Sequence, residues 1–237
     1  MAKYFSALLP IFLFNATLIA QTLPRDTAFV SAGRENTKNF YINTMKEQNQ
    51  LYNGGDYLDY RSLKDEHPYY ISEDWITGSV QYNHEQYDDV SLLYNIQTDN
   101  IITEQPSSAV MIQLIRDKVQ SFTMDGHQFV MIAKNEDLST GFYDQLCNGN
   151  VKLYAKRIKD FQETISGAEL QRNFIEKNRY YLYKNGHYYP VKNKKSILTI
   201  LGDRKRELNQ FIRQNHIHIR QNREAAFIKL TEYYNGN

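Results

Sequence analysis

The chain has 237 residues, of which 41% are hydrophobic, and its formal net charge is +1 at pH 7. That length is enough for one large domain, or two small ones, with a sizeable core. Its single cysteine, Cys147, excludes an intramolecular disulfide, so the chain is not a small secreted scaffold stapled by disulfides.

The first predicted element is a secretory signal peptide over residues 1–20. Lys3 gives a positive start, the run from Tyr4 to Ile19 is almost wholly apolar, and the small residue Ala20 ends it. This order is typical of an export signal, and the apolar run is too short and too interrupted to span a bilayer. The alternative is a buried N-terminal helix. We therefore expect an exported chain with no transmembrane span after cleavage.

Residues 21–55 are predicted to be a polar lead-in. The stretch is rich in Asn, Gln and Thr and has only a weak helical pattern. The Asn53-Gly54-Gly55 sequence is a turn signal that ends it.

Residues 56–158 are predicted to be β-rich. Their strands are expected at residues 75–82, 88–94 (after a polar loop at 83–87), 95–102 (with a turn at 98–100), 110–115, 119–124, 128–132, 141–146 and 151–155. Asp125-Gly126 is a strong signal for a two-residue hairpin. Short strands at this spacing suggest an antiparallel meander that curls into a sandwich or part-barrel.

Residues 159–237 are predicted to form a hairpin and a helical region. The stretch 156–175 is charged and weakly helical, and a tyrosine-rich hairpin over 179–191 follows, with Asn185-Gly186 at its turn. Two amphipathic helices are expected, at 196–214 with Ser196 as the N-cap and at 222–234. The predicted fold class is therefore α+β, with both helices folded back on the sheet.

The charges are segregated along the chain. Residues 21–150 carry 9 basic and 19 acidic side chains, whereas residues 151–237 carry 18 basic and 8 acidic ones. Either the two halves neutralise each other by packing, which we favour, or the basic half meets an acidic partner. Export argues against nucleic acid as that partner, and leaves anionic lipid head groups, acidic glycans or another envelope protein.

No motif in the sequence identifies a catalytic, cofactor or metal site. His216-Ile217-His218 resembles a metal-binding pair, but two ligands are incomplete, and a polar loop is the ordinary interpretation. No serine lies in a nucleophile elbow and no glycine-rich phosphate loop is present. We therefore expect no cofactor and no metal, and a binding role rather than catalysis.

The order of several segments carries a family resemblance. These segments are Leu51-Tyr52-Asn53-Gly54, His67-Pro68-Tyr69-Tyr70, Gly78-Ser79-Val80-Gln81-Tyr82, Val90-Ser91-Leu92-Leu93-Tyr94, Gly141-Phe142-Tyr143, and the tyrosine hairpin with its continuation at residues 191–196. The chain resembles a group of uncharacterised exported envelope proteins of Gram-negative bacteria that has no known activity. The resemblance implies an envelope location, periplasmic or at the cell surface. It implies no known activity, so it assigns no catalytic residue to this chain.

Three functions follow as expectations. The leading one is a binding protein that contacts an anionic surface through the tyrosine hairpin and a basic helix face, at Tyr181, Tyr183, Tyr188, Tyr189, Arg204, Lys205, Arg206 and Arg213. The second is an exported hydrolase whose acid and base come from His84, Asp88, Asp89 and His127. The third is a structural partner in an envelope assembly, in which the charged halves dock between chains.

Overall fold

The computed structural model of the chain describes residues 33–34, 50–58, 66–106, 108, 110–166 and 169–236. The chain divides into two units, Met1–Thr44 and Met45–Asn237, and the fold described below belongs to the second. The predicted signal peptide lies outside the described residues, as does most of the polar lead-in.

The second unit contains an antiparallel sheet of eleven strands, in the order β1-β5-β4-β3-β2-β6-β7-β8-β9-β12-β13. The strands are β1 (Gly55–Asp56), β2 (Ile76–Tyr82), β3 (Glu85–Asn95), β4 (Asn100–Glu104), β5 (Met111–Gln113), β6 (Val119–Met124), β7 (His127–Ile132), β8 (Gly141–Cys147), β9 (Lys152–Lys156), β12 (Arg179–Lys184) and β13 (His187–Val191). The sheet is not closed, and β1 and β13 are its end strands. The predicted α+β class and antiparallel meander are confirmed.

Two-residue turns with positive φ join successive strands of the meander. Asp125 and Gly126 have φ of 48° and 74° between β6 and β7, and Asn185 and Gly186 have φ of 52° and 87° between β12 and β13. Such turns match the right-handed twist of paired strands, and they need residues that tolerate positive φ. Both predicted hairpin turns are confirmed. A third turn of this kind, at residues 83–84, replaces the longer loop predicted at 83–87.

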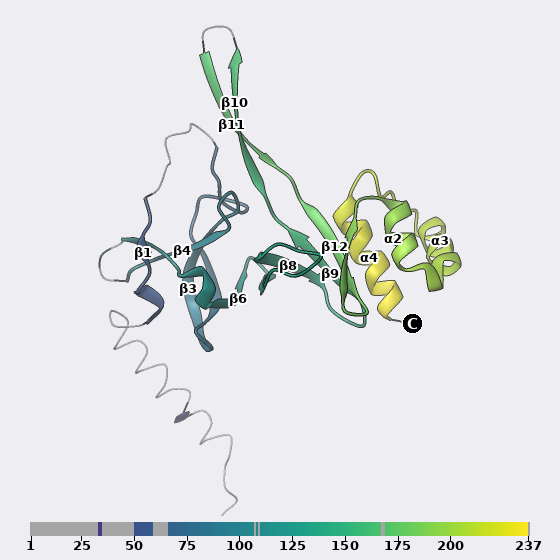
Figure 1. The fold of residues 1–237 in the computed structure, drawn as a ribbon, viewed down its shortest axis with the longest axis horizontal. Helices are drawn as coiled ribbons and strands as arrows, with labels where there is room; N and C mark the ends of the chain where they lie inside the picture. The colour runs from purple at the N-terminus through teal and green to yellow at the C-terminus, as the bar shows by residue number, and fades with distance from the viewer. Residues whose placement is uncertain are drawn as a thin grey trace, which may run out of the picture. The chain divides into compact units, whose positions relative to one another are not determined.

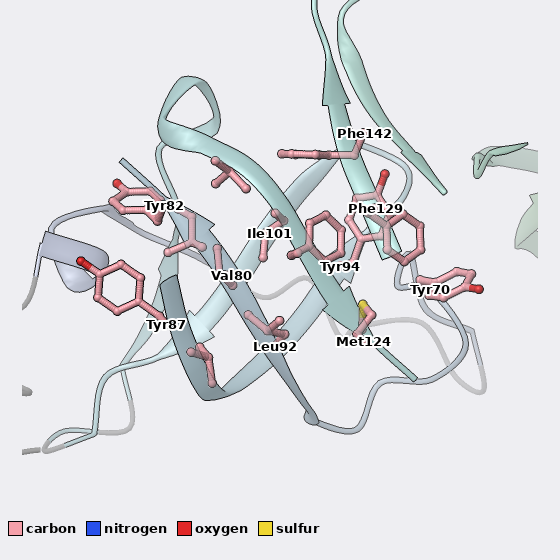
Figure 2. Close-up of a cluster of buried hydrophobic side chains, with 14 of the residues drawn as sticks. Tyr70, Val80, Tyr82, Tyr87, Leu92, Tyr94, Ile101, Met124, Phe129 and Phe142 are labelled. Carbon is pink, nitrogen blue, oxygen red and sulfur yellow. The ribbon is translucent and has the colours of Figure 1, made fainter. Parts of the chain in front are cut away.

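One face of the sheet carries two hydrophobic cores. The first packs aromatic side chains from β3, β6, β7 and β8, and Figure 2 shows Tyr94, Phe129 and Phe142 meeting in it. The second lies under the C-terminal helices and includes Leu182 and Phe227. Side chains of β8 belong to both cores, Phe142 to the first and Cys147 to the second, so the two cores meet at this strand.

Three α-helices follow the sheet: α2 (Lys194–Ile200), α3 (Lys205–Gln214) and α4 (Arg223–Asn235). The helix α2 contacts β13, and α4 contacts β8 and β9 (Figure 1). We call residues 192–236 the helical layer. Among the described residues, no helix is both long and apolar enough to cross a membrane.

The prediction of one continuous helix at 196–214 is wrong. Gly202 begins a 3₁₀ turn, η4 (Gly202–Arg204), that separates α2 from α3, because glycine is a weak helix former and the backbone at Leu201 has already left the helical region. The N-cap of α2 is Asn193, and Ser196 is the third helical residue, which completes a capping box. The second predicted helix is confirmed, with Asn222 as its N-cap.

The weakly helical interpretation of residues 156–175 is also wrong. Strands β10 (Lys159–Ser166) and β11 (Glu169–Glu176) pair as a separate two-stranded ribbon (Figure 1). Phe161 pairs with Phe174 across the ribbon, with ring centroids 5.4 Å apart. Such cross-strand aromatic pairs stabilise a ribbon, and they cannot be recognised before the register is known.

Candidate anion-binding site on the helical layer

A buried ion pair lies where the two cores meet. Asp144 on β8 is fully buried, and Arg157, 4% exposed, donates to its Oδ2 through Nε at 3.0 Å and Nη2 at 2.5 Å. The Nδ1–H of His127 on β7 donates to the same oxygen at 2.9 Å, a tautomer that follows because the carboxylate can only accept. Asp144 therefore compensates charge in a region that is otherwise apolar.

Glu224, on the helical layer, also pairs with Arg157. It is the second residue of α4, and its carboxylate accepts from Arg157 Nη1 at 2.5 Å and Nη2 at 3.0 Å. Tyr180 on β12 donates its hydroxyl to the same side chain at 3.0 Å. Arg157 thus bridges two acids, one on the sheet and one on the helix, and fixes the start of α4 against the strands.

The ion pairs shift the pKa of their members in different directions. The hydrogen bond to Asp144 raises the pKa of His127 above its ordinary value, against the opposing effect of burial. Burial acts to raise the pKa of Glu224, but its hydrogen bonds and charge contact with Arg157 outweigh burial and lower it. Both shifts favour the charged forms of these two side chains.

A second ionic cluster surrounds Asp99. Lys156 on β9 donates to its Oδ1 at 2.6 Å, the Tyr94 hydroxyl donates at 2.6 Å, and Arg116 donates to Oδ2. Lys156 and Arg157 belong to the basic half of the chain, and their partners Asp99 and Asp144 belong to the acidic half. The two halves therefore do neutralise each other at these points.

The exposed cations of the helical layer, unlike Lys156 and Arg157, are not paired with acids that the structure describes. Three of its four acids are already paired: Asp203 with Lys184, Glu207 with Arg204, and Glu224 with Arg157. Nine exposed basic side chains have no ion-pair partner within the part of the chain that the structure describes: Lys192, Lys194, Lys195, Lys205, Arg206, Arg213, Arg220, Arg223 and Lys229. The excess positive charge of the C-terminal half is therefore concentrated here.

Five of these cations surround one hollow, which we call the basic hollow. Its volume is about 440 Å³, and it is lined by Lys192, Asn193, Lys194, Lys195, Ile219, Arg220 and Arg223. Two segments meet there, the connection from β13 into α2 and the turn between α3 and α4. Ile219 is buried in the second core and so anchors that turn.

The fold holds both segments in place by local hydrogen bonds. The Asn193 side chain accepts from the backbone N–H of Ser196 at 3.0 Å, and the Ser196 hydroxyl accepts from the backbone N–H of Asn193 at 3.0 Å. The Asn222 side chain accepts from the backbone N–H of Ala225 at 3.0 Å. The cations around the hollow are therefore brought together by helix capping and core packing.

The predicted tyrosine contacts lie away from this hollow. Tyr181, Tyr183 and Tyr188 pack with Tyr143 and other side chains on the sheet face opposite to the helical layer. Because side chains alternate along a strand, Tyr189 points to the other face, where it is 39% exposed. The hairpin tyrosines are thus divided between two faces of the sheet.

The predicted basic contacts are also divided. Lys205, Arg206 and Arg213 are exposed on α3. Arg204 instead donates to Glu207 and, at 2.9 Å, to the carbonyl of Tyr234 on α4. Arg204 therefore holds the helices together, whereas the other three cations face solvent.

The four residues predicted for a hydrolase are not gathered together. His84 is exposed in the turn between β2 and β3, and Asp88 and Asp89 are exposed on β3. His127 does lie within hydrogen-bond distance of a carboxylate, but that carboxylate is Asp144. Asp144 was not predicted from the sequence. The one available signal is its position two residues after the apolar Phe142, which places both side chains on the same face of the strand and makes a buried acid there unusual.

His216 and His218 line a smaller hollow of about 210 Å³ beside α4. The described residues contain no group of three or more His, Cys, Asp or Glu side chains that could hold a metal ion. Cys147 is buried, and burial raises the pKa of its thiol. A raised pKa disfavours the reactive thiolate.

Comparisons with known proteins found no match of any kind. No family model matches the chain, no curated protein matches its sequence, and no solved structure matches its fold.

Proposed function

We propose that the chain is a non-catalytic binding protein of the cell envelope, and that it attaches to an anionic surface through its helical layer. The observation that carries this proposal is the set of nine exposed cations that lack ion-pair partners among the described residues, in a layer whose acids are mostly paired. Like charges repel one another, so a surface of this kind gains free energy from an anionic partner.

The proposed location is the periplasm or the cell surface of a Gram-negative bacterium. The order of Lys3, the apolar run and Ala20 supports export, and the segment resemblance supports an envelope protein. An exported basic layer meets anionic lipid head groups and acidic glycans rather than nucleic acid. Each Lys or Arg near an anionic lipid surface contributes roughly 1 kcal/mol to attachment.

The test is cosedimentation of the intact mature chain with phosphatidylglycerol vesicles. A triple variant, Lys205→Ser, Arg206→Ser and Arg213→Ser, removes exposed cations and leaves Arg204 to hold the helices. Three lost cations should weaken attachment at least about tenfold at low salt, because each contributes on the order of 1 kcal/mol. Attachment of the unmodified chain should also fall as salt screens the charges.

A matched control removes three cations outside the helical layer, the exposed Lys134 and Arg179 and the half-buried Lys118. This control has the same net charge as the triple variant, so it separates a local surface from a general charge effect. Equal loss of attachment in both variants would reject the helical layer as the contact surface. Absence of vesicle attachment at any salt concentration would reject the proposed function.

A hydrolase is the second candidate, because His127 and Asp144 form a hydrogen-bonded pair and the His127 side chain is 31% exposed. In such a pair the carboxylate orients the imidazole, whose other nitrogen can accept a proton from water. Chromogenic ester, phosphodiester and glycoside substrates test this candidate. Turnover that His127→Gln abolishes would establish it, and absence of turnover by the intact chain would reject it.

A further inference from the structure

We infer that the basic hollow binds a compact phosphate group that carries more than one negative charge, such as a phosphomonoester. This inference rests on the proposed function, since it names the chemistry that the helical layer would recognise on an anionic surface. It concerns one site, whereas the cations of α3 supply attraction that is not selective.

The lining of the hollow selects for charge. Five of its seven lining residues are Lys or Arg, none is acidic, and Ile219 is its one apolar member. Cations that line one hollow repel one another, and a singly charged ligand would neutralise only a small part of this charge. Ile219 is itself buried in the second core. The lining therefore suits a small polyanion.

The placement of Arg223 is unfavourable without a ligand. Arg223 is the first residue of α4, and Glu224, the acid in the same turn, is already paired with Arg157. A cation near the start of a helix lies against the positive end of its dipole. A bound anion reverses this repulsion, so the same residue that costs stability in the free protein would contribute affinity.

Phosphate fits this arrangement better than carboxylate does. A phosphomonoester offers three terminal oxygens, so donors from Lys192, Lys194 and Lys195 on one side and from Arg220 and Arg223 on the other can share it. The two guanidinium groups match phosphate geometry through paired hydrogen bonds, and lysines add point charges. A volume of about 440 Å³ accommodates a head group or a sugar phosphate.

The experiment compares three vesicle types of equal surface charge, containing phosphatidic acid, phosphatidylglycerol or oleate. They present a phosphomonoester, a phosphodiester and a carboxylate. The intact mature chain should bind phosphatidic acid vesicles at least about fivefold more tightly than either of the others, because charge-assisted hydrogen bonds are strong and directional. A fourth arm measures direct binding of inorganic phosphate by calorimetry at constant ionic strength.

The test variant is Lys194→Gln with Arg223→Gln, and the matched control is Lys205→Gln with Arg206→Gln on α3. The test variant should lose the preference for phosphatidic acid, while the control should weaken binding to all three vesicles and keep the preference. Equal binding of the unmodified chain to the three vesicles would overturn the inference and leave the proposed function standing. A preference that only the control variant loses would also overturn it.

The phosphate arm identifies the source of the ligand. Binding of inorganic phosphate that Lys194→Gln with Arg223→Gln abolishes, without attachment to any vesicle, would support the hollow as a site for a soluble phosphate compound. The same result would reject attachment to a lipid surface. The two proposals therefore fail under different observations.

Discussion

The region around β8 and the helical layer use the same kinds of charged side chain in opposite ways. Around β8, Arg157 is almost fully buried and pairs with Asp144 and Glu224. On the helical layer, Arg223 is exposed and has no ion-pair partner among the described residues, although it is the neighbour of Glu224 in the chain.

Burial explains this difference. A charge taken out of water must be compensated by a partner, whereas an exposed charge is hydrated and can remain available. Net charge alone therefore does not assign a role to the basic half of this chain. Its buried cations join the two cores, and its exposed cations are the ones that can meet a ligand.

The largest effect on stability is expected at Asp144. The substitution Asp144→Asn removes the charge that compensates Arg157 in a fully buried position, and breaking a buried pair costs about 3–5 kcal/mol. Urea unfolding measures the loss. The control Asp117→Asn changes an exposed acid and should shift the free energy of unfolding by no more than about 0.5 kcal/mol. Similar values for the two would contradict a structural role for the buried pair.

A smaller loss is expected at Glu224, which is partly exposed. Glu224→Gln keeps the shape of the side chain but weakens its charge-assisted hydrogen bonds with Arg157, at a cost of about 1–3 kcal/mol. Glu232→Gln, at an exposed position of the same helix, is the control. The difference between the losses of unfolding free energy in the two variants measures how much the ion pair stabilises the start of α4. Equal losses would show that the ion pair does not stabilise it.

Stability should also depend on the charge of His127. Its pKa is raised in the folded protein by Asp144, so its contribution is fully present below the unfolded pKa of about 6.5 and is lost as pH rises through the folded value. His127→Gln should remove this part of the pH dependence, with Arg157 and Asp144 still paired. The test is the free energy of unfolding measured from about pH 5 to about pH 9, a range that includes the ordinary pKa of histidine. An unchanged profile in the variant would assign the dependence to another group.

The smallest effect has the opposite sign. Lys194→Gln with Arg223→Gln removes two mutually repelling cations of the basic hollow, one of them at the start of α4, so the free protein should become more stable by up to about 1 kcal/mol at low salt. Thermal unfolding at low and high salt measures this gain, which screening should reduce. A clear loss of stability in the variant would contradict this prediction and show that the two cations stabilise the free protein.

The sequence predicted those features that depend on neighbouring residues. The turns at Asp125-Gly126 and Asn185-Gly186 were predictable because positive φ restricts which residues fit, and Asn222 marks the start of α4 by its own capping bond. The ribbon of β10 and β11 was missed because polar residues predominate in both strands, and the pairing of Phe161 with Phe174 is visible only once the register is known.

The candidate site was only partly predictable. The excess of Lys and Arg after residue 150 was visible in the sequence, and so were the exposed cations of α3. The basic hollow was not, because it forms where residues 192–195 meet residues 219–223 in space. Likewise, no local pattern indicates that Arg157 pairs with both Asp144 and Glu224, because Glu224 lies 67 residues after Arg157 in the chain.

The most direct test of the central claim is hydrogen–deuterium exchange on the chain without its proposed signal peptide, residues 1–20, in the presence and absence of phosphatidic acid vesicles. The connection into α2 at residues 192–193 and the turn at residues 215–222 are loops of the helical layer, whereas the β12–β13 turn at residues 185–186 belongs to the tyrosine hairpin. Exchange in exposed loops reports local protection. We expect vesicles to slow exchange in the two helical-layer loops and to leave the hairpin turn unchanged. Slower exchange in the hairpin turn alone would contradict the claim that the helical layer is the contact surface.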